Sequence, residues 1–487
     1  MLPPDPEQET RVANHPLDPI FHPRAVAVVG ASSRPGGANF VSALIEQGCE
    51  TIYPVNPNAD EILGLPVFPN LGAIPGPVDH VISSIPADRV EPMLEDAGAK
   101  GVRSMHFFTA GFAETGESDR LALQQRIVHR AKELNIRVFG PNCLGLYVPG
   151  SGLAFASGCP TDAGPVAFWA QSGTNANTVI YDGALRGLRF SKVVSFGNAV
   201  DVNAAELCRY ALADPQTEFV GAYIEGLPDA RDLFQALREL AAEKPVALLK
   251  GGMTDAGARS TRSHTASLAG SGAIWRAAAT QANAVLVGSM QESIDMLVGW
   301  RFGAVPQGER VALVVGGGGL SVQGSDDIAS LGLTLPDLTV ATAERLRELT
   351  PIAGTSIRNP VDTQSLWRGD DLAPTLETIA ADDNLDALIV QIGTSWGGAM
   401  DPGFAQKRQD RLFRELQQAT PRLAKIGKPV ALVIPTSHDP FTAQLSGGLL
   451  QRVIALGYPT FTSVPAAART LQRLNTWRRR RAERAPG

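Results

Sequence analysis

The sequence of 487 residues lacks the features that mark membrane-spanning, secreted and metal-binding proteins. No apolar run reaches about 18 residues, the length that a membrane-spanning helix needs. The first residues are rich in proline and acidic side chains, unlike a secretory signal. The four cysteines form no C-x-x-C pair and no metal-ligand spacing: Cys49, Cys143, Cys159 and Cys208. We therefore expect a cytoplasmic protein with reduced structural cysteines, no membrane segment and no metal site.

Two glycine-rich nucleotide motifs are also missing. The sequence contains no G-x-x-x-x-G-K-[ST], so no phosphate-binding loop of that type is expected. The turn after the first apolar run reads Gly30-Ala31-Ser32 and lacks the G-x-G-x-x-G pattern. The next run ends Val55-Asn56-Pro57, with no carboxylate for a ribose diol. Both observations weigh against a nicotinamide dehydrogenase.

Composition and charge describe an ordinary globular protein. Hydrophobic residues make up 44% and charged residues 19% of the chain, and the net charge is −6. This balance gives no reason to expect a nucleic acid or an anionic membrane as partner. The length predicts about three domains. The 49 glycines and 35 prolines have no period, as expected for many tight turns between strands and helices.

Short apolar runs alternate with helical stretches along the whole chain. Such alternation predicts doubly wound parallel sheets. Strands are expected at 25–29, 51–55, 80–85, 105–108, 137–139, 164–170, 192–196, 219–224, 246–249, 311–315, 387–393 and 429–434. We expect a flexible leader over 1–20, α/β domains over 21–148, 149–303 and 304–475, and a basic tail over 476–487.

In the first predicted domain, four turns follow strands and would share one edge of the sheet. They are Gly30-Ala31-Ser32, Ile85-Pro86-Ala87, residues 109–114 and residues 140–145, which include Asn142. Open α/β sheets bind ligands at this edge, and a helix start there offers N–H groups to a phosphate. Each turn could also be purely structural. Together they favour a nucleotide-like ligand.

His264 is the candidate nucleophile of the second predicted domain. It lies among small hydroxyl residues that leave room for a phosphoryl group on the ring. Strand alternation places Glu225 and the turn Ser172-Gly173-Thr174 at the same sheet edge. A carboxylate would fix the tautomer of the ring, and a helix start at Gly173 would attract phosphate. The alternative is a loop histidine whose nitrogens are satisfied by backbone groups.

The third predicted domain opens with a strand that runs into four consecutive glycines, Gly316-Gly317-Gly318-Gly319. Neither strand nor helix propensity explains such a run. It would let the backbone approach a ligand closely or let a helix begin unhindered.

Taken in order, these motifs give a family resemblance. The series is G-A-S, V-N-P, G-P-N-C-L-G, Q-S-G-T, S-F-G-N, Y-I-E-G and S-H-T-A-S-L-A-G, followed by the glycine run. It resembles the α subunit of ADP-forming acyl-CoA (acetyl-CoA) synthetases, in the succinyl-CoA synthetase superfamily, from about Phe21 to about Arg473. The resemblance implies a Rossmann-like CoA-binding domain followed by two flavodoxin-like ligase domains, the first of which carries a phosphohistidine.

The resemblance also implies a role for each candidate residue. His264 would be phosphorylated, and Glu225 would orient it. The helix starts Ser172-Gly173-Thr174 and Gly317-Gly318-Gly319 would clasp the phosphohistidine. Ala266 stands where family members commonly have glycine. The implied CoA site consists of Gly30, Ala31, Ser32, Val55, Asn56, Pro57, Ile85, Pro86 and Asn142.

The implied reaction joins a small carboxylic acid to CoA at the expense of ATP, through an acyl phosphate and phospho-His264. Because the chain has no nucleotide motif and no span for an ATP-grasp domain pair, ATP, ADP and Mg²⁺ would act through a separate ATP-grasp β subunit in a hetero-oligomer. Two alternatives remain open: a CoA-binding regulatory protein of the same fold without turnover, and a dehydrogenase-like nucleotide enzyme.

The G-A-S turn without an acidic residue after the second strand generates the first prediction. CoA should bind the chain, and NADH should not. Isothermal titration calorimetry with each ligand in turn checks this. Comparable affinities for CoA and NADH would contradict the expectation.

Overall fold

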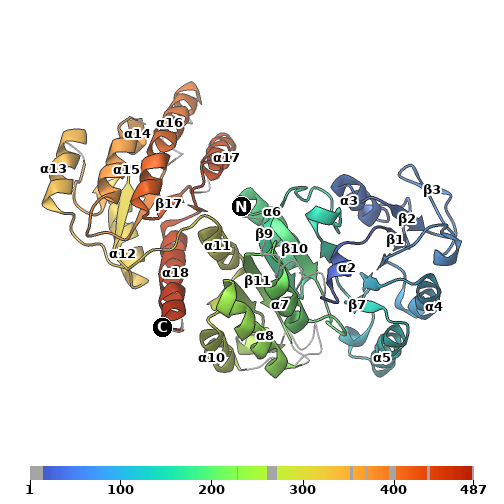
Figure 1. Cartoon of the computed structure of the whole chain (residues 1–487). Coiled ribbons are helices and arrows are strands. Elements are labelled where there is room, and N and C mark those ends of the chain that lie inside the picture. The colour runs from blue at the N-terminus through green and yellow to red at the C-terminus, as the bar shows by residue number, and fades with distance from the viewer. Residues whose placement is uncertain are drawn as a thin grey trace. The chain divides into compact units, whose positions relative to one another are not determined.

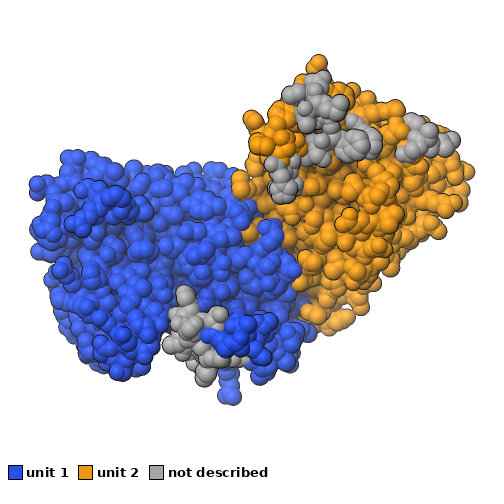
Figure 2. All heavy atoms as spheres, turned by 180° about the vertical axis from the view of Figure 1, so that it is seen from behind, with its two compact units in different colours: residues 1–184, 188–293 blue, residues 185–187, 294–487 orange. Residues whose placement is uncertain are grey.

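The computed structural model describes residues 15–226, 229–259, 271–350, 355–368, 370–393, 402–435 and 439–484. The chain divides into two compact units (Figure 2). Unit 1 comprises residues 1–184 and 188–293, and unit 2 comprises residues 185–187 and 294–487. Unit 1 contains two large sheets and unit 2 contains the third. None of the described helices is both long and apolar enough to span a bilayer.

The first sheet of unit 1 is entirely parallel, in the order β2-β1-β5-β6-β7. Its apolar strands are buried on both faces, as parallel strands usually are. A two-stranded hairpin, β3 (Glu61–Ile62) and β4 (Leu65–Pro66), forms a separate small sheet that lies against β2. The strands are β1 (Val26–Val29), β2 (Ile52–Val55), β5 (His80–Ser83), β6 (Ser104–Phe107) and β7 (Arg137–Phe139).

Helices cover both faces of this sheet (Figure 1). Helices α4 (Val90–Lys100) and α5 (Ser118–Glu133) bury an apolar stripe against one face. Helix α3 (Asn39–Gln47) covers the other, where its Phe40 ring lies 5.7 Å from the His106 ring. On that face, His80 and His106 form a buried pair with 3.0 Å between Nε2 and Nδ1. Burial lowers the pKa of His80 to about 3 and holds the pKa of His106 well below its usual value, so both rings are neutral at neutral pH.

The second sheet of unit 1 has the order β13-β12-β11-β9-β10-β8, and only β8 is antiparallel. The strands are β8 (Gly145–Tyr147), β9 (Ala163–Ala170), β10 (Phe190–Ser195), β11 (Phe219–Ile224), β12 (Val246–Lys250) and β13 (Val285–Val287). The connecting helices are α6 (Gly173–Leu185), α7 (Ala204–Ala213), α8 (Ala230–Glu243) and α10 (Gly272–Ala282). Helix α11 (Met290–Arg301) crosses the boundary between the units.

Unit 2 is built on a parallel sheet in the order β15-β14-β16-β17-β18. The strands are β14 (Val311–Val315), β15 (Val361–Asp362), β16 (Ala387–Gln391), β17 (Val430–Val433) and β18 (Thr460–Phe461). The helices are α12 (Gly318–Ser330), α13 (Val340–Leu349), α14 (Ser365–Arg368), α15 (Leu372–Ala380), α16 (Pro402–Ile426), α17 (Pro440–Ala455) and α18 (Val464–Arg484). Helices α15, α16 and α17 pack on one face, and α12 lies against α18.

All three sheets use the same parallel order. When the parallel strands of each sheet are numbered along the chain, they lie as 2-1-3-4-5. This is the flavodoxin-like order, whose switch point lies beside the first strand, and ligands bind at the carboxyl ends there. The predicted fold class, successive doubly wound α/β domains, is therefore confirmed.

Three segments differ from the sequence expectation. Residues 15–20 were expected in the leader, but Leu17 and Ile20 are buried and α2 (Asp18–Phe21) forms there. Gly145–Tyr147, expected at the end of the first domain, pairs with β10 of the second sheet. The four arginines at 478–481 were expected at a solvated helix terminus and lie in α18, but this helix continues through the expected tail boundary at 476 as far as Arg484. Four-residue helices, three-residue strands and exposed charged turns carry too little periodicity for a pattern to reveal them.

Candidate functional site

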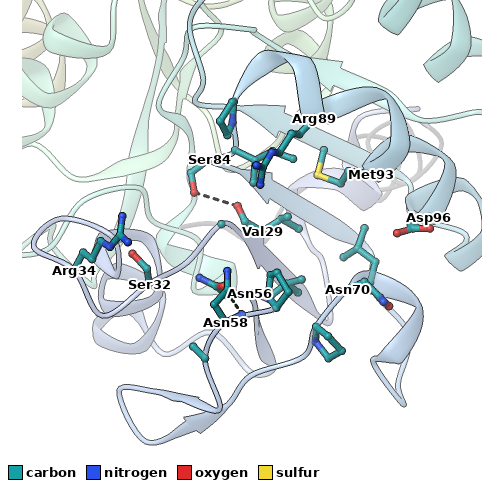
Figure 3. A pocket seen from close by; sticks show the side chains of 18 of the residues that line it. Val29, Ser32, Arg34, Asn56, Asn58, Asn70, Ser84, Arg89, Met93 and Asp96 are labelled. Carbon is teal, nitrogen blue, oxygen red and sulfur yellow. Dashed lines mark hydrogen bonds between the residues drawn. The ribbon is translucent and has the colours of Figure 1, made fainter.

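A hollow of about 580 Å³ opens at the carboxyl ends of β1, β2 and β5, which is the switch point of the first sheet (Figure 3). Seven of the nine residues predicted for the CoA site line it. They are Gly30, Ser32, Val55, Asn56, Pro57, Ile85 and Pro86. Three strand ends that are far apart in the sequence therefore meet at one cavity.

The first turn approaches the neighbouring strand so closely that it requires glycine. Gly30 has a φ of +91°, and a Cβ there would lie 2.9 Å from Ser84 Oγ. The Ser84 hydroxyl in turn donates to the Val29 carbonyl at 3.1 Å. A side chain at position 30 would clash with Ser84 and Ile85 and would be strained at this positive φ.

Asn56 connects the second strand end to the first turn. Its Nδ2 donates to the carbonyl of Ala31 at 2.7 Å, and its Oδ1 accepts the N–H of Asn58 at 2.9 Å. Ala31 itself is fully buried and contributes through that carbonyl instead of lining the cavity. The predicted V-N-P stretch thus shapes the wall through the amide of Asn56.

Two exposed arginines in the cavity wall were not among the residues that the sequence predicted for the CoA site. Arg34 comes from the turn after β1, and Arg89 lies just before α4, on another side of the cavity (Figure 3). Asp96 lies at the end opposite to Arg34 (Figure 3). CoA carries several phosphates, and arginine suits phosphate recognition. The volume, the glycine turn and the two cations therefore fit a CoA molecule. The sequence did contain a signal that could have identified both residues, because each is an arginine within a few positions of a predicted turn at a strand end.

Asn142 lies outside the cavity, at the end of β7. It has a φ of +57°, and its N–H donates to the Thr109 carbonyl at 3.0 Å. The same turn packs on the second sheet, because a Cβ at Gly173 would lie 2.8 Å from Leu144 Cγ. Asn142 thus lies between the first sheet's edge and the start of α6.

Glu225 lies at the carboxyl edge of the second sheet, directly after β11, and is 8% exposed. The Tyr223 hydroxyl donates to Glu225 Oε1 at 2.9 Å. Gln171 Oε1, at the end of β9, accepts the N–H of Glu225 at 2.5 Å and that of Gly226 at 2.9 Å. These bonds hold the backbone of Glu225 and its carboxylate in a fixed place.

The predicted helix start at Ser172-Gly173-Thr174 lies at the same edge. Helix α6 begins at Gly173, and Ser172 Oγ accepts the N–H of Asn175 at 3.3 Å. The strands before Ser172 and Glu225 are paired, with Ala170 opposite Tyr223. The first N–H groups of a helix have no partner within it and carry positive charge, so this start can receive an anion.

The glycine run of unit 2 also begins a helix. Gly317 caps α12 with a φ of +151°, and a Cβ on Gly317 or Gly319 would contact nothing within 4 Å. The open backbone agrees with the expectation of an unhindered helix start. The Asp362 carboxylate accepts the N–H of Gly317, and burial raises the pKa of Asp362.

His264 lies outside the described residues, as does its closest rival in the sequence, His438. Two other histidines, His80 and His106, are buried in the first sheet. His22 and His129 are paired with Asp18 and Glu133 on helices. None of these four lies at the carboxyl edge that holds Glu225.

Two segments of this chain match known protein families. Residues 24–149 match the family described as "CoA binding domain", and residues 163–298 match the family "Succinyl-CoA ligase like flavodoxin domain". The α subunit of acetate–CoA ligase [ADP-forming] II from Pyrococcus furiosus is 33% identical over 410 residues, which are 84% of this chain and 89% of that protein.

Two further proteins resemble nearly the whole chain. Acetate–CoA ligase [ADP-forming] II from Archaeoglobus fulgidus is 30% identical over 96% of this chain, which spans 68% of that protein. The solved dinucleotide-forming acetyl-coenzyme A synthetase 1 from Ca. Korarchaeum cryptofilum, in complex with phosphate and ADP, is 28% identical. The structural match has a TM-score of 0.79 and covers 96% of this chain and 97% of that one.

The order of domains, the cavity and these relatives define a CoA-binding α/β protein. The chain belongs to the family of ADP-forming acetyl-CoA and acyl-CoA synthetases, in the succinyl-CoA synthetase superfamily.

The two cavity arginines generate the second prediction. Arg34→Ala and Arg89→Ala should each weaken CoA binding by about tenfold, because each removes a charged partner of a phosphate. Calorimetry with CoA measures the loss. Arg130→Ala, which removes a surface arginine paired with Glu95 and Glu133, is the matched control and should bind like the wild type. Unchanged affinity in both cavity variants would place CoA elsewhere.

Proposed function

We propose that this chain is the CoA-binding subunit of an ADP-forming acyl-CoA synthetase and carries its phosphohistidine. The net reaction is acid + CoA + ATP ⇌ acyl-CoA + ADP + phosphate. The observation that carries the proposal is that unit 1 contains two sites, each at the carboxyl ends of strands. One is a cavity that suits CoA, and the other is a carboxylate held at a sheet edge beside a helix start.

The cavity would bind CoA through its phosphates and leave the thiol to accept the acyl group. Ser32 would face a phosphate from the turn after β1, and Arg34 and Arg89 would add charge. Asn56 keeps the first two strand ends together through the Ala31 carbonyl. Asn142, which lies outside the cavity, would hold CoA nearer to the start of α6.

The second site would transfer the phosphoryl group. In the direction of acid release, phosphate attacks the acyl-CoA to give an acyl phosphate and free CoA. His264 then takes the phosphoryl group, which frees the acid, and passes it to ADP. Glu225 would fix the tautomer of the ring and stabilise its cationic form during transfer. The helix starts Ser172-Gly173-Thr174 and Gly317-Gly318-Gly319 would hold the phosphohistidine. At the second of these, the N–H groups that follow Gly317 would face it, because the N–H of Gly317 donates to Asp362.

The nucleotide would reach His264 on another protein. The relative from P. furiosus is named a subunit α, which supports a separate partner. We propose an ATP-grasp β subunit that binds ATP or ADP with Mg²⁺ and forms a hetero-oligomer with this chain. The acid substrate is a small carboxylic acid, and the assay described below identifies it.

A regulatory CoA-binding protein of the same fold is the alternative. The hydrogen bonds around Glu225 favour the enzyme. A carboxylate that is 8% exposed costs free energy to bury, and a protein without turnover has no use for holding it there.

The third prediction tests the proposed function itself. Incubated with its ATP-grasp partner, ATP and Mg²⁺, the chain should acquire an acid-labile phosphate on His264, and the chain alone should not. Tandem mass spectrometry under alkaline conditions locates the group. A panel of acids with CoA then identifies the substrate. Label on His438, or full synthetase activity in His264→Ala, would overturn the proposal.

The fourth prediction concerns the carboxylate. Glu225→Gln should slow phosphorylation of His264 by an amount on the order of 2–4 kcal/mol in the barrier, because the cationic ring loses its charged partner. CoA affinity should stay the same. Rapid-quench labelling and calorimetry measure the two quantities. Glu206→Gln, which removes a carboxylate paired with Arg137, is the control. An unchanged labelling rate in Glu225→Gln would remove Glu225 from the mechanism.

A further inference from the structure

Lys250 is a buried cation at the same sheet edge as Glu225. It is the last residue of β12, pairs in register with Ile224 and is 4% exposed. Its Nζ donates to the carbonyl of Glu225 at 2.7 Å and also to the carbonyl of Gly251. The ammonium lies 5.4 Å from the centre of the Trp275 ring. One side chain therefore joins the turns that follow β11 and β12.

The bonds of Lys250 complete a set of contacts around Glu225. Gln171, after β9, holds the N–H of Glu225, and Lys250 holds its carbonyl. Tyr223, within β11, holds its carboxylate. Three neighbouring strands thus fix the backbone and the side chain of a single residue. Fixing a reactive group from several rigid elements is what precise chemistry requires.

The close packing beside Lys250 agrees with a fixed position for this turn. A Cβ at Gly251 would lie 2.8 Å from Tyr223 Oη and 3.3 Å from Glu225 Cγ. Only glycine lets the two turns approach so closely. Burial lowers the pKa of Lys250, and the charge of Glu225 raises it. The carboxylate therefore favours the charged form of this ammonium.

A buried ammonium is a costly way to join two loops, because an apolar side chain of similar volume often stabilises a protein equally well. Its charge has a purpose if the site accepts a phosphoryl group. A phosphorylated side chain carries roughly −1.5 to −2 charges at neutral pH. Such a group beside the Glu225 carboxylate would be repelled unless a cation compensates.

We infer that Lys250 is a positioning residue for the phosphoryl transfer, which fixes Glu225 by its carbonyl and offsets the negative charge that arrives with the phosphoryl group. This inference rests on the proposed function. Lys250 acts through Glu225 and through the local electrostatic field, and makes no bond to the reacting atoms.

The chain contains a matched control at the other end of the same strand. Lys244 lies just before β12, and its Nζ donates to the carbonyls of Ala211 at 2.6 Å and Asp214 at 2.7 Å. Burial lowers the pKa of Lys244 to about 8. Both lysines therefore donate to two backbone carbonyls, but only Lys250 does so at the edge that holds Glu225.

The experiment compares Lys250→Met with Lys244→Met in the full chain, mixed with the ATP-grasp partner, labelled ATP and Mg²⁺. We expect Lys250→Met to label His264 about 100-fold more slowly, the cost of misplacing a reactive group slightly. Lys244→Met should label at nearly the wild-type rate. The melting temperatures of both should fall by similar amounts, and their CoA affinities should match that of the wild type. Equal labelling rates in the two variants would overturn the inference.

Chemical rescue tests the role of the charge. Lys250 borders a hollow of about 670 Å³ between α8 and α10, which lie side by side in Figure 1, so a small amine can reach the place of its side chain. Ethylammonium should restore labelling in Lys250→Ala, and n-propanol should not. Equal effects of the two additives would contradict the electrostatic role. If the wild type itself is not labelled on His264, the proposed function fails first, so the two failures are distinguishable.

Discussion

Three strand ends meet around one carboxylate, and the chemistry proposed for this protein depends on that meeting. Residues from β9, β11 and β12 hold the N–H, the carboxylate and the carbonyl of Glu225. A parallel sheet makes this possible, because the carboxyl ends of its strands all face one edge. Each hydrogen bond contributes only about 1 kcal/mol to stability. Together they fix a charged group that would otherwise move in solvent.

The same constraint organises the CoA side of unit 1. Gly30, Asn56 and Ser84 follow three strands of the first sheet and meet at its switch point. The turn that contains Asn142 then packs on Gly173 at the start of α6. The turn after the last strand of the first sheet is therefore linked to the second sheet where Leu144 packs on Gly173. A side chain at Gly30 or Gly173 would displace the turns that form the two sites, although neither glycine carries a side chain that could contact a ligand.

The sequence predicted what depends on repeated patterns. Apolar runs with glycine turns indicated the sheets, and seven of the nine residues expected at the CoA site line one cavity. What it missed depends on distant contacts. Lys250 reads as the end of an apolar strand, and only the fold brings it to the Glu225 carbonyl. Tyr223 and Gln171 likewise gain their roles from strand pairing. The short β8 carries no periodicity that would assign it to the second sheet.

In the proposed reaction, the phosphoryl group is bound covalently to this chain on its way between the nucleotide and the acid. A rapid-quench chase of the labelled chain tests it most directly. After phosphorylation by labelled ATP and the partner, excess ADP should return the label to ATP, and the acid with CoA should release it as phosphate. Both transfers should be at least as fast as steady-state turnover. Label that stays on the chain while unlabelled substrates turn over would contradict the account.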